Sequence, residues 1–418
     1  MGDKISNLAI GFLVTVVVAR YLGPEDFGIY SYALSLAALF AAAGHMGLSG
    51  LVVREIVKKP DERATILGTT LLLKLSGMLI GYFALVIYAY IYEGLGSIEF
   101  NAIAIVGAIL IFKSFDIIDF WFQAFIQAKY VTFARLIGLF IDSSLKLVFV
   151  FLGLGLIYFV TATLVQSIIV AIALLIAYKI KSIIKISEWK FNWIKAKELL
   201  SQGWVIYLGS IFAVIYLKVD QVMLRWYVGA EAVGIYAVAA QISEAWYFIP
   251  TAIVASFFPK LIKLREESTE HFNKRLQQLF DLLFIIAIMV AIIMTILSDW
   301  FINLFFGNFY SESASVLVIH IWAAIFIFMR AAFSKWILIE NALIFSLVTQ
   351  GAGAIINIIL NYLLIPKYGV IGAAYATIIS YSFASFFSLL IYKKTRPVFF
   401  MMLNSILFIF RLKIKGIK

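Results

Sequence analysis

One stretch of this sequence occurs twice: residues 20–33 read RYLGPEDFGIYSYA, and residues 226–239 read WYVGAEAVGIYAVA. The two copies match in register at Tyr, Gly, Glu, Gly-Ile-Tyr and Ala, and they lie 206 positions apart in a chain of 418 residues. An offset close to half the chain predicts two related halves. The alternative is a chance coincidence of glycine-rich turns between apolar segments.

The composition around these copies is typical of a membrane protein. Hydrophobic residues make up 64% of the chain and charged residues only 14%, whereas about a quarter of the residues in a soluble chain are charged. Apolar runs of ~20 residues predict spanning helices, and the strict alternation of a barrel strand is absent. We therefore expect an all-α integral membrane protein. Its twelve or so helices are expected near 5–22, 28–53, 65–91, 99–123, 131–153, 156–178, 199–226, 234–258, 278–298, 313–334, 341–364 and 370–392.

The basic residues predict how these helices are oriented. If the N-terminus is cytoplasmic, 27 of the 34 Lys and Arg residues fall in cytoplasmic segments. Positive charge collects on the cytoplasmic side of membrane proteins, so we expect both termini to be inside. The net charge of +11 is then a signal of topology and of anionic lipid, and nucleic acid is not an expected partner.

The repeat also predicts a domain organisation. Six helices separate the two copies, and an even number gives both halves the same orientation. Parallel repeats of this kind are typical of transporters in which two helical bundles enclose a central cavity. We expect two pseudo-symmetric six-helix lobes with a linker and a tail: an N-terminal lobe over 1–180, a basic cytoplasmic linker over 181–198, a C-terminal lobe over 199–392 and a basic interfacial tail over 393–418.

Three separated blocks of sequence carry a family resemblance. They are Ala19–Gly28 followed by Arg54-Glu55, Val219–Leu224 running into Gly234-Ile235-Tyr236, and Asn361–Ala374. In this order they resemble the polysaccharide transporter (Wzx-type O-antigen flippase) family, and the resemblance covers essentially the whole chain. This family belongs to the multidrug/oligosaccharidyl-lipid/polysaccharide exporter superfamily.

The resemblance implies a transporter and not an enzyme. It implies movement of a polyprenyl-diphosphate-linked oligosaccharide across the cytoplasmic membrane of a prokaryote, by alternating access driven by a Na⁺ or H⁺ gradient. The implied partners are this lipid-linked substrate, membrane lipids, and polysaccharide polymerases or glycosyltransferases; no other cofactor is implied. Extruder relatives carry an intramembrane acid on the first helix, whereas this chain has only Asp3 at the edge of that helix.

Cations within the predicted spans are candidates for binding the diphosphate. Burying a charge in the membrane costs at least ~2.5–3.5 kcal/mol, so such residues usually face a cavity or a partner. The candidates are Arg20, Lys74, Lys113, Lys146, Lys218 and Arg225. Pairing remains an alternative, because Asp142 and Lys146 are four residues apart and Lys113 and Asp116 three. Lys74 could instead extend to the cytoplasmic interface.

Carboxylates within the spans are candidates for coupling to an ion. These candidates are Asp142, Asp220 and Glu244. Two facing carboxylates could hold Na⁺ or share a proton, although Asp220 could instead pair with Lys218 or Arg225.

Other polar residues within the spans are expected to serve packing. His45 and His320 lack a second ligand at metal spacing, so no metal site is expected. Asn357 and Asn361 are expected to form hydrogen bonds between helices, with sugar contact as the alternative. Pro250 predicts a kink or an unwound turn.

Two other classes of function compete with the flippase. A drug or small-solute antiporter of the same superfamily would need fewer intramembrane cations and a coupling acid in the first lobe. A membrane-embedded glycosyltransferase or ligase would need metal-binding acids or a large catalytic loop outside the membrane. The longest outer loop, near 299–312, carries only Asp299 and Glu312.

Overall fold

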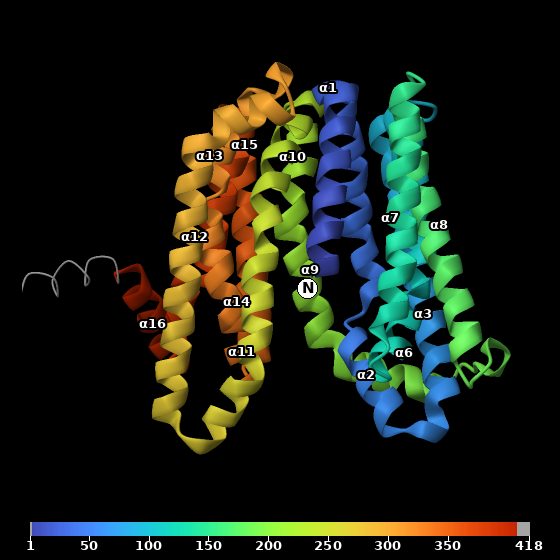
Figure 1. Cartoon of the computed structure of the whole chain (residues 1–418), viewed down its shortest axis with the longest axis vertical. Helices are drawn as coiled ribbons and strands as arrows, with labels where there is room; N and C mark the ends of the chain where they lie inside the picture. Colours follow the sequence, from blue (N-terminus) through green and yellow to red (C-terminus); the bar gives the residue numbers. More distant parts are fainter. Residues whose placement is uncertain (1, 408–418) are drawn as a thin grey trace, which may run out of the picture. The chain divides into compact units, whose positions relative to one another are not determined.

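The computed structural model describes residues 2–407, with side chains from residue 10 onward. Every regular element in this part of the chain is a helix, which confirms the all-α prediction. The chain divides into two compact units, Met1–Val222 and Met223–Lys418. Figure 1 shows the helices coloured along the sequence.

The helices of the two units are as follows. The first unit contains α1 (Gly2–His45), α2 (Ser49–Lys58), α3 (Arg63–Glu93), α4 (Ile98–Gly107), α5 (Ile109–Lys113), α6 (Ile117–Ala124), α7 (Ala128–Phe151), α8 (Leu156–Lys181) and most of α9 (Trp193–Tyr227). The second contains α10 (Ala230–Glu244), α11 (Phe248–Glu267), α12 (Thr269–Phe305), α13 (Glu312–His320), α14 (Ala323–Ile339), α15 (Leu343–Ser385) and α16 (Arg396–Ile406).

The repeated stretch of sequence forms a sharp turn between two helical segments. Within α1 the backbone leaves the helix at Gly23, where φ is 76° and ψ is 172°, and the two arms of α1 lie side by side (Figure 1). Gly229, the matching residue of the second copy, has φ 123° and ψ −177°. Only glycine adopts such angles without strain. The backbone conformation of the turn therefore explains why glycine occurs at this position in both copies.

Eight helices or joined helices in residues 2–407 are long and apolar enough to cross a membrane. Two of them, Ile10–Lys58 and Leu343–Leu390, each cover two of the expected spans. The expected span 99–123 is interrupted along α4, α5 and α6, and the expected span 131–153 is α7, which carries several charges. Multiple membrane-length helices are therefore present, while the count of twelve stays a prediction.

The helix around Pro250 is interrupted. α10 ends at Glu244, a 3-10 turn occupies Ala245–Tyr247, and α11 starts at Phe248. Pro250 then lies in the first turn of α11. Backbone N–H groups in the first turn of a helix have no intrahelical acceptor, so the missing N–H of proline costs no hydrogen bond there. The predicted unwound turn is therefore found, just before the proline.

The segment between α8 and α9 is bound to α3 by its backbone. Asn192 N donates to Thr69 Oγ1 at 3.0 Å, and Lys190 N donates to Ala64 O at 3.4 Å. A side chain at Gly68 would place its Cβ within 2.5 Å of the Lys190 backbone. The expected linker 181–198 thus follows a fixed path across the first unit.

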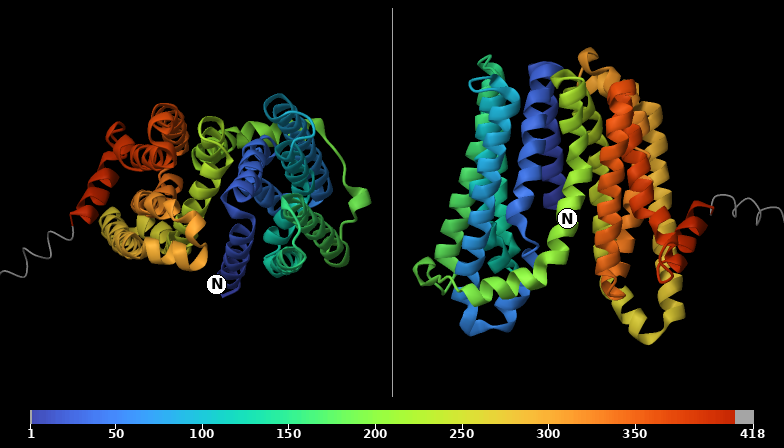
Figure 2. Two further views of the ribbon diagram at one scale, coloured as in Figure 1. Left: turned by 90° about the horizontal axis from the view of Figure 1, so that it is seen from above. Right: turned by 180° about the vertical axis from the view of Figure 1, so that it is seen from behind.

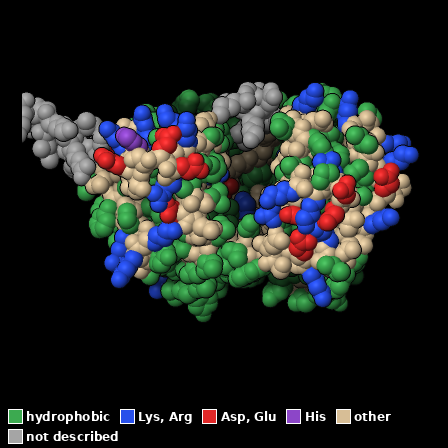
Figure 3. All heavy atoms as spheres, turned by 90° about the horizontal axis from the view of Figure 1, so that it is seen from below, with side chains coloured by type: hydrophobic (Ala, Val, Ile, Leu, Met, Phe, Trp, Pro, Cys, Tyr) green, Lys and Arg blue, Asp and Glu red, His purple; other side chains and the backbone are tan. Residues whose placement is uncertain are grey.

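A cluster of ion pairs joins the end of α2 to the beginning of α9. Glu198 accepts hydrogen bonds from Lys59 at 3.3 Å and from Lys195 at 2.9 Å, and Lys195 also pairs with Glu62 at 2.5 Å. Figure 2 shows the first turns of α9 running beside α2, and Figure 3 shows Lys and Arg side chains among Asp and Glu side chains on this face.

The compact units do not coincide with the predicted repeats at α9. The sequence repeat places α9 at the start of the second half, whereas the residues of α9 up to Val222 belong to the first compact unit. The predicted lobe boundary was drawn from the sequence repeat, so it stays a prediction.

The tail helix α16 packs against α12 in the second unit. Gln277 donates to Ser405 Oγ at 2.9 Å, and Ser405 donates to Asp281 Oδ1 at 2.6 Å. Val398, Phe399 and Met402 are buried. The predicted interfacial tail is therefore partly a packed helix, and its residues 408–418 lie outside the described part of the chain.

Glu340 follows α14 and holds together three segments of the second unit. Its carboxylate accepts a hydrogen bond from Arg265 at 2.6 Å and pairs with Lys394 at 3.3 Å. Burial alone would raise the pKa of this carboxyl, but the hydrogen bonds from Arg265 and Lys394 outweigh burial and leave the pKa below its ordinary value. The ionised form is therefore the one that the fold stabilises.

Replacing Glu340 by glutamine is expected to destabilise the protein by about 1–3 kcal/mol, because two cations lose a charge-assisted partner. The loss of stability relative to wild type should be complete above the ordinary glutamate pKa of about 4.3. It should disappear as the pH falls through the lowered pKa of Glu340 in the folded protein. Thermal unfolding of both proteins at about pH 7 and about pH 3 measures this. Glu267→Gln is the matched control, because its pair with Lys263 is exposed and 3.7 Å long. An equal loss in the two variants would contradict the role of Glu340.

Candidate functional site in the first unit

The fourth predicted span loses its regular helix where its charged residues occur. α5 ends at Lys113, a 3-10 turn covers Ser114–Asp116, and α6 carries Asp119. Irregular backbone at membrane depth is tolerated where it is buried in protein or lines a water-filled cavity. The interrupted helix therefore indicates a polar interior in the first unit.

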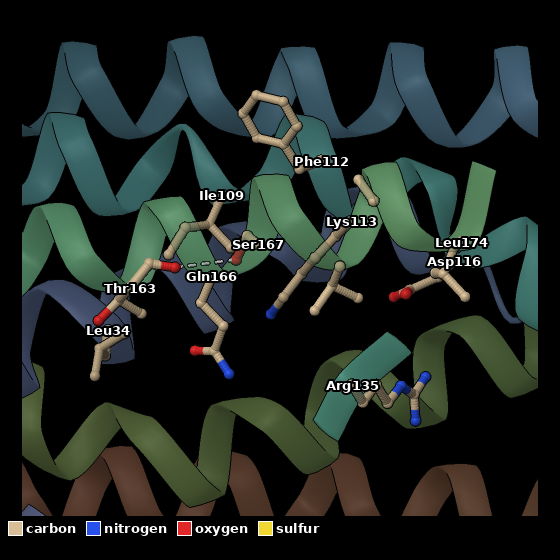
Figure 4. Close-up of a pocket in the computed structure, with 12 residues that line it drawn as sticks. Leu34, Ile109, Phe112, Lys113, Asp116, Arg135, Thr163, Gln166, Ser167 and Leu174 are labelled. Carbon is tan, nitrogen blue, oxygen red and sulfur yellow. Dashed lines mark hydrogen bonds between the residues drawn. The ribbon is translucent and has the colours of Figure 1, made fainter. Parts of the chain in front are cut away.

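A pocket of about 370 Å³ lies beside this interruption. Its polar lining residues are Lys113, Asp116, Arg135, Thr163, Gln166 and Ser167, from α5, the 3-10 turn, α7 and α8. Figure 4 shows the Lys113 ammonium directed toward the Gln166 amide, with Asp116 and Arg135 toward the other end of the pocket. The pocket therefore has the Lys113 ammonium at one end, and the Asp116 carboxylate beside the Arg135 guanidinium at the other.

Lys113 and Asp116 do not neutralise each other directly. Within residues 2–407 the structure contains no ion pair between these two side chains, although they are three residues apart. Arg135 instead donates to Asp119 Oδ2 at 2.7 Å, and Gln123 donates to the other oxygen of Asp119 at 2.9 Å. In the described part of the chain Lys113 therefore forms no direct ion pair with Asp116, and its ammonium is left to the pocket.

Lys74 lies behind the same region in α3. Its side chain is only 3% exposed, and its ammonium lies 5.0 Å from the centre of the Phe120 ring. Aromatic faces attract a cation, with a stronger effect when water is excluded. The alternative in which Lys74 extends to the membrane surface is therefore wrong.

Asp142 and Lys146 form a buried ion pair one turn apart on α7. Lys146 Nζ donates to Asp142 Oδ2 at 2.8 Å and to the Tyr30 hydroxyl at 3.1 Å. These three residues and Gln166 line a second pocket of about 120 Å³. The pairing alternative is therefore found here, and Gln166 lines this pocket as well as the larger one.

The other candidate residues lie away from these two pockets. Arg20 is exposed, Asp220 is buried, and Lys218, Arg225 and Glu244 are half-buried. Asp220 lies in the first unit and Glu244 in the second, so a joint role for these carboxylates stays a prediction.

The two histidines of the predicted spans lie in different surroundings. His45 is exposed at the end of α1, and His320 is buried against the Tyr236 ring. Over residues 2–407 no group of three potential metal-binding side chains occurs.

The second unit repeats part of this architecture without its charges. The Tyr30 and Thr163 hydroxyl oxygens are 2.8 Å apart in the first unit. In the second unit, Tyr236, which matches Tyr30 in the repeat, has its hydroxyl oxygen 3.1 Å from that of Thr377.

At the spacing of Asp142 and Lys146, the second unit carries neutral amides. Asn361 donates to Asn357 at 3.1 Å, and Asn357 donates to Ser380 at 3.2 Å. The predicted hydrogen bonds of the two asparagines are therefore found. The first unit therefore has a charged pair in the predicted membrane interior, and the second unit has a neutral pair at the same spacing.

Four polar residues of the pocket were missed by sequence reasoning: Arg135, Thr163, Gln166 and Ser167. Arg135 was expected in a cytoplasmic segment because it lies near the start of a span, and Gln166 is an uncharged residue in an apolar run. Gln166 is the polar residue of α8 that lies one turn beyond Thr163. Helical spacing from Thr163 is the one signal that could have identified it.

Comparison with known proteins places this architecture in a family. A family model described as "Polysaccharide biosynthesis protein" matches residues 4–265, which is more than half of the chain. The chain belongs to the polysaccharide biosynthesis protein family. The predicted resemblance is confirmed, and a model described as "Lipid II flippase MurJ" also matches residues 245–412.

Two curated relatives of this family member are named as a flippase and a transporter. The chain is 24% identical to a "Probable flippase AglR" of Haloferax volcanii, with 92% of this chain and 80% of the relative covered. It is 26% identical to a "Putative O-antigen transporter" of Shigella flexneri, with 88% of each covered. The prediction that the chain is a transporter and not an enzyme is confirmed.

Solved structures share the fold of this polysaccharide biosynthesis protein. An inward-facing multidrug resistance MATE transporter of the MOP superfamily gives a TM-score of 0.73 at 14% identity, with 95% of this chain and 96% of that chain covered. Lipid II flippase MurJ in an inward closed conformation gives 0.71 at 18% identity, with 99% and 92% covered. The fold is therefore that of the MATE and MurJ transporters.

Proposed function

We propose that this chain is a flippase that moves polyprenyl-diphosphate-linked oligosaccharide across the cytoplasmic membrane of a prokaryote. The observation that carries the proposal is Lys113, whose ammonium points into the polar pocket and takes no carboxylate partner within residues 2–407. A diphosphate loses hydration when it enters a membrane protein, and a cation offers it a charge-assisted hydrogen bond. Lys74 and Arg135 add positive charge around the same region.

The proposed topology follows from the two repeats. Twelve spanning helices in two six-helix lobes, with both termini in the cytoplasm, would give each half the same orientation. The repeated turns at Gly23 and Gly229 support this arrangement. A central cavity between the lobes would open to either side in turn, with Arg20, Lys218 and Arg225 as further candidates for its cationic lining.

The proposed energy source is a Na⁺ or H⁺ gradient. No nucleotide-binding motif occurs in the sequence, and Asp142, Asp220 and Glu244 are the candidate coupling carboxylates. The flippase would receive its substrate from membrane glycosyltransferases and would deliver it to a polysaccharide polymerase or a further glycosyltransferase.

Replacing Lys113 by glutamine is expected to slow translocation about 10- to 100-fold, because a hydrogen bond to a charged group contributes about 1.5–3 kcal/mol. The assay is movement of a short polyprenyl-diphosphate oligosaccharide in proteoliposomes, with and without imposed Na⁺ and proton gradients. Lys263→Gln is the control, because this lysine is 77% exposed and pairs with the exposed Glu267 at 3.7 Å.

The same proteoliposomes test the competing function. If wild type moves no lipid-linked sugar but exports cationic dyes, the chain is a drug antiporter and the proposal fails. If Lys113→Gln and Lys263→Gln transport at the wild-type rate, the pocket is not on the pathway of the substrate.

A further inference from the structure

The two ends of the 370 Å³ pocket differ chemically. At one end the Lys113 ammonium lies toward the Gln166 amide, as Figure 4 shows. Both groups donate hydrogen bonds, and an oxyanion accepts them. This end therefore suits one phosphate group.

The other end carries the carboxylate of Asp116. Arg135 lies beside it but donates to Asp119 at 2.7 Å, and within residues 2–407 no ion pair or hydrogen bond of the Asp116 carboxylate occurs. A carboxylate accepts hydrogen bonds only and repels a second phosphate at close range. This end therefore selects a ligand group that donates hydrogen bonds and carries no negative charge.

Neutral polar side chains connect the two ends. Thr163, Gln166 and Ser167 line the pocket from α8, and Ser167 Oγ donates to the Thr163 carbonyl at 3.3 Å. Hydroxyls and amides both donate and accept hydrogen bonds. A ligand that fills the pocket therefore needs a phosphate at one end and several hydroxyl groups at the other.

We propose that this pocket binds the phosphate ester of an uncharged sugar, with the phosphate on Lys113 and Gln166 and the sugar hydroxyls on Asp116. The volume lies within the range of about 300–1,000 Å³ that is usual for small-molecule sites. This inference rests on the proposed function, in which the ligand is the sugar attached directly to the lipid diphosphate. The flippase then reads that first sugar, and an acidic sugar in its place is rejected by Asp116.

The first experiment measures binding of soluble probes to the full-length protein in detergent by isothermal titration calorimetry. The probes are glucose 1-phosphate, galactose 1-phosphate, N-acetylglucosamine 1-phosphate, inorganic phosphate and methyl glucoside. At least one sugar phosphate should bind about tenfold more tightly than phosphate, which corresponds to one added hydrogen-bonding contact. Equal binding of phosphate and all three sugar phosphates, or no binding of any of them, would overturn the proposal.

Two variants separate the two ends of the pocket. Asp116→Asn should lower affinity for the sugar phosphate to that for phosphate while leaving phosphate binding unchanged. Lys113→Gln should weaken both ligands about 10- to 100-fold, and Lys263→Gln should weaken neither. Because Asp116→Asn could impair folding, its thermal midpoint is measured alongside, and Gln166→Ala gives a second route to the phosphate end. Unchanged sugar-phosphate binding in a folded Asp116→Asn variant would contradict the assignment.

A competition experiment distinguishes the lipid-linked source of the ligand from a free one. A short-chain polyprenyl-diphosphate sugar should displace the soluble sugar phosphate, whereas failure to displace it would show that the pocket serves a free metabolite. Translocation by wild type is measured separately. If wild type moves lipid-linked sugar but the pocket variants bind normally, only this inference fails; if wild type moves none, the proposed function fails.

Discussion

Replacing Lys146 by alanine is expected to lower the free energy of unfolding by about 3–5 kcal/mol, the range measured when one partner of a buried ion pair is removed. Lys146 and Asp142 are 7% and 6% exposed. The alanine variant would leave the Asp142 carboxylate buried without its cation. It would also remove the hydrogen bond to the Tyr30 hydroxyl.

Thermal unfolding in detergent measures this loss, and a paired variant identifies its cause. Asp142→Asn combined with Lys146→Met removes both charges and keeps similar volumes, so it should recover most of the stability. Lys129→Ala, an exposed cation on the same helix α7, should change little. The explanation fails if the double variant is as unstable as Lys146→Ala.

Replacing Gly47 by alanine is expected to cost about 2–4 kcal/mol, from an unfavourable backbone conformation together with overpacking. Gly47 has φ +63°, and a Cβ there would lie 2.6 Å from the Gly203 carbonyl oxygen and 2.7 Å from Tyr207 N. Both atoms belong to the backbone of α9, so no side chain can rotate away. The variant would therefore separate the α1–α2 turn from α9.

Gly50→Ala provides the matched control three residues away. A Cβ at Gly50 meets nothing within 4 Å, and alanine favours the helix by about 0.5–1 kcal/mol over glycine. This variant should be neutral or stabilising in the same thermal unfolding assay. Equal destabilisation by both substitutions would mean that the close approach at Gly47 is not what matters.

The fold could be predicted from sequence as far as helix type and repeat. Apolar length predicted the helices, because backbone groups in hydrocarbon must be paired within each segment. The turns at Gly23 and Gly229 fall in the expected breaks between spans 5–22 and 28–53 and between spans 199–226 and 234–258, although their sharp geometry was not predicted. The interruption at Ser114–Asp116 could not be predicted, because Lys113, Asp116 and Asp119 occur in a run that is otherwise as apolar as its neighbours.

The candidate site was only partly predictable for a related reason. Lys74, Lys113 and Lys146 were identified because a charge in an apolar span is expensive. Which of them is paired depends on side-chain direction and on neighbouring helices: Lys146 meets Asp142, whereas Lys113 turns from Asp116 toward Gln166. Both Asp142–Lys146 and Lys113–Asp116 have a spacing that permits pairing along a helix. Spacing alone therefore could not show that only the first of them forms an ion pair in the part of the chain that the structure describes.

The asparagine pair of the second unit has a consequence for how such a chain can evolve. Asn357 and Asn361 are four residues apart, as Asp142 and Lys146 are, and they carry amides where that pair carries an acid and a base. In an assembly of two identical subunits, any mutation at these positions would alter both halves at once. Fusion of the two copies into one gene removes that restriction, so one half can lose its charges while the other keeps them. After duplication and fusion, the two halves can therefore change independently, so that one keeps buried charged residues and the other packs with neutral ones.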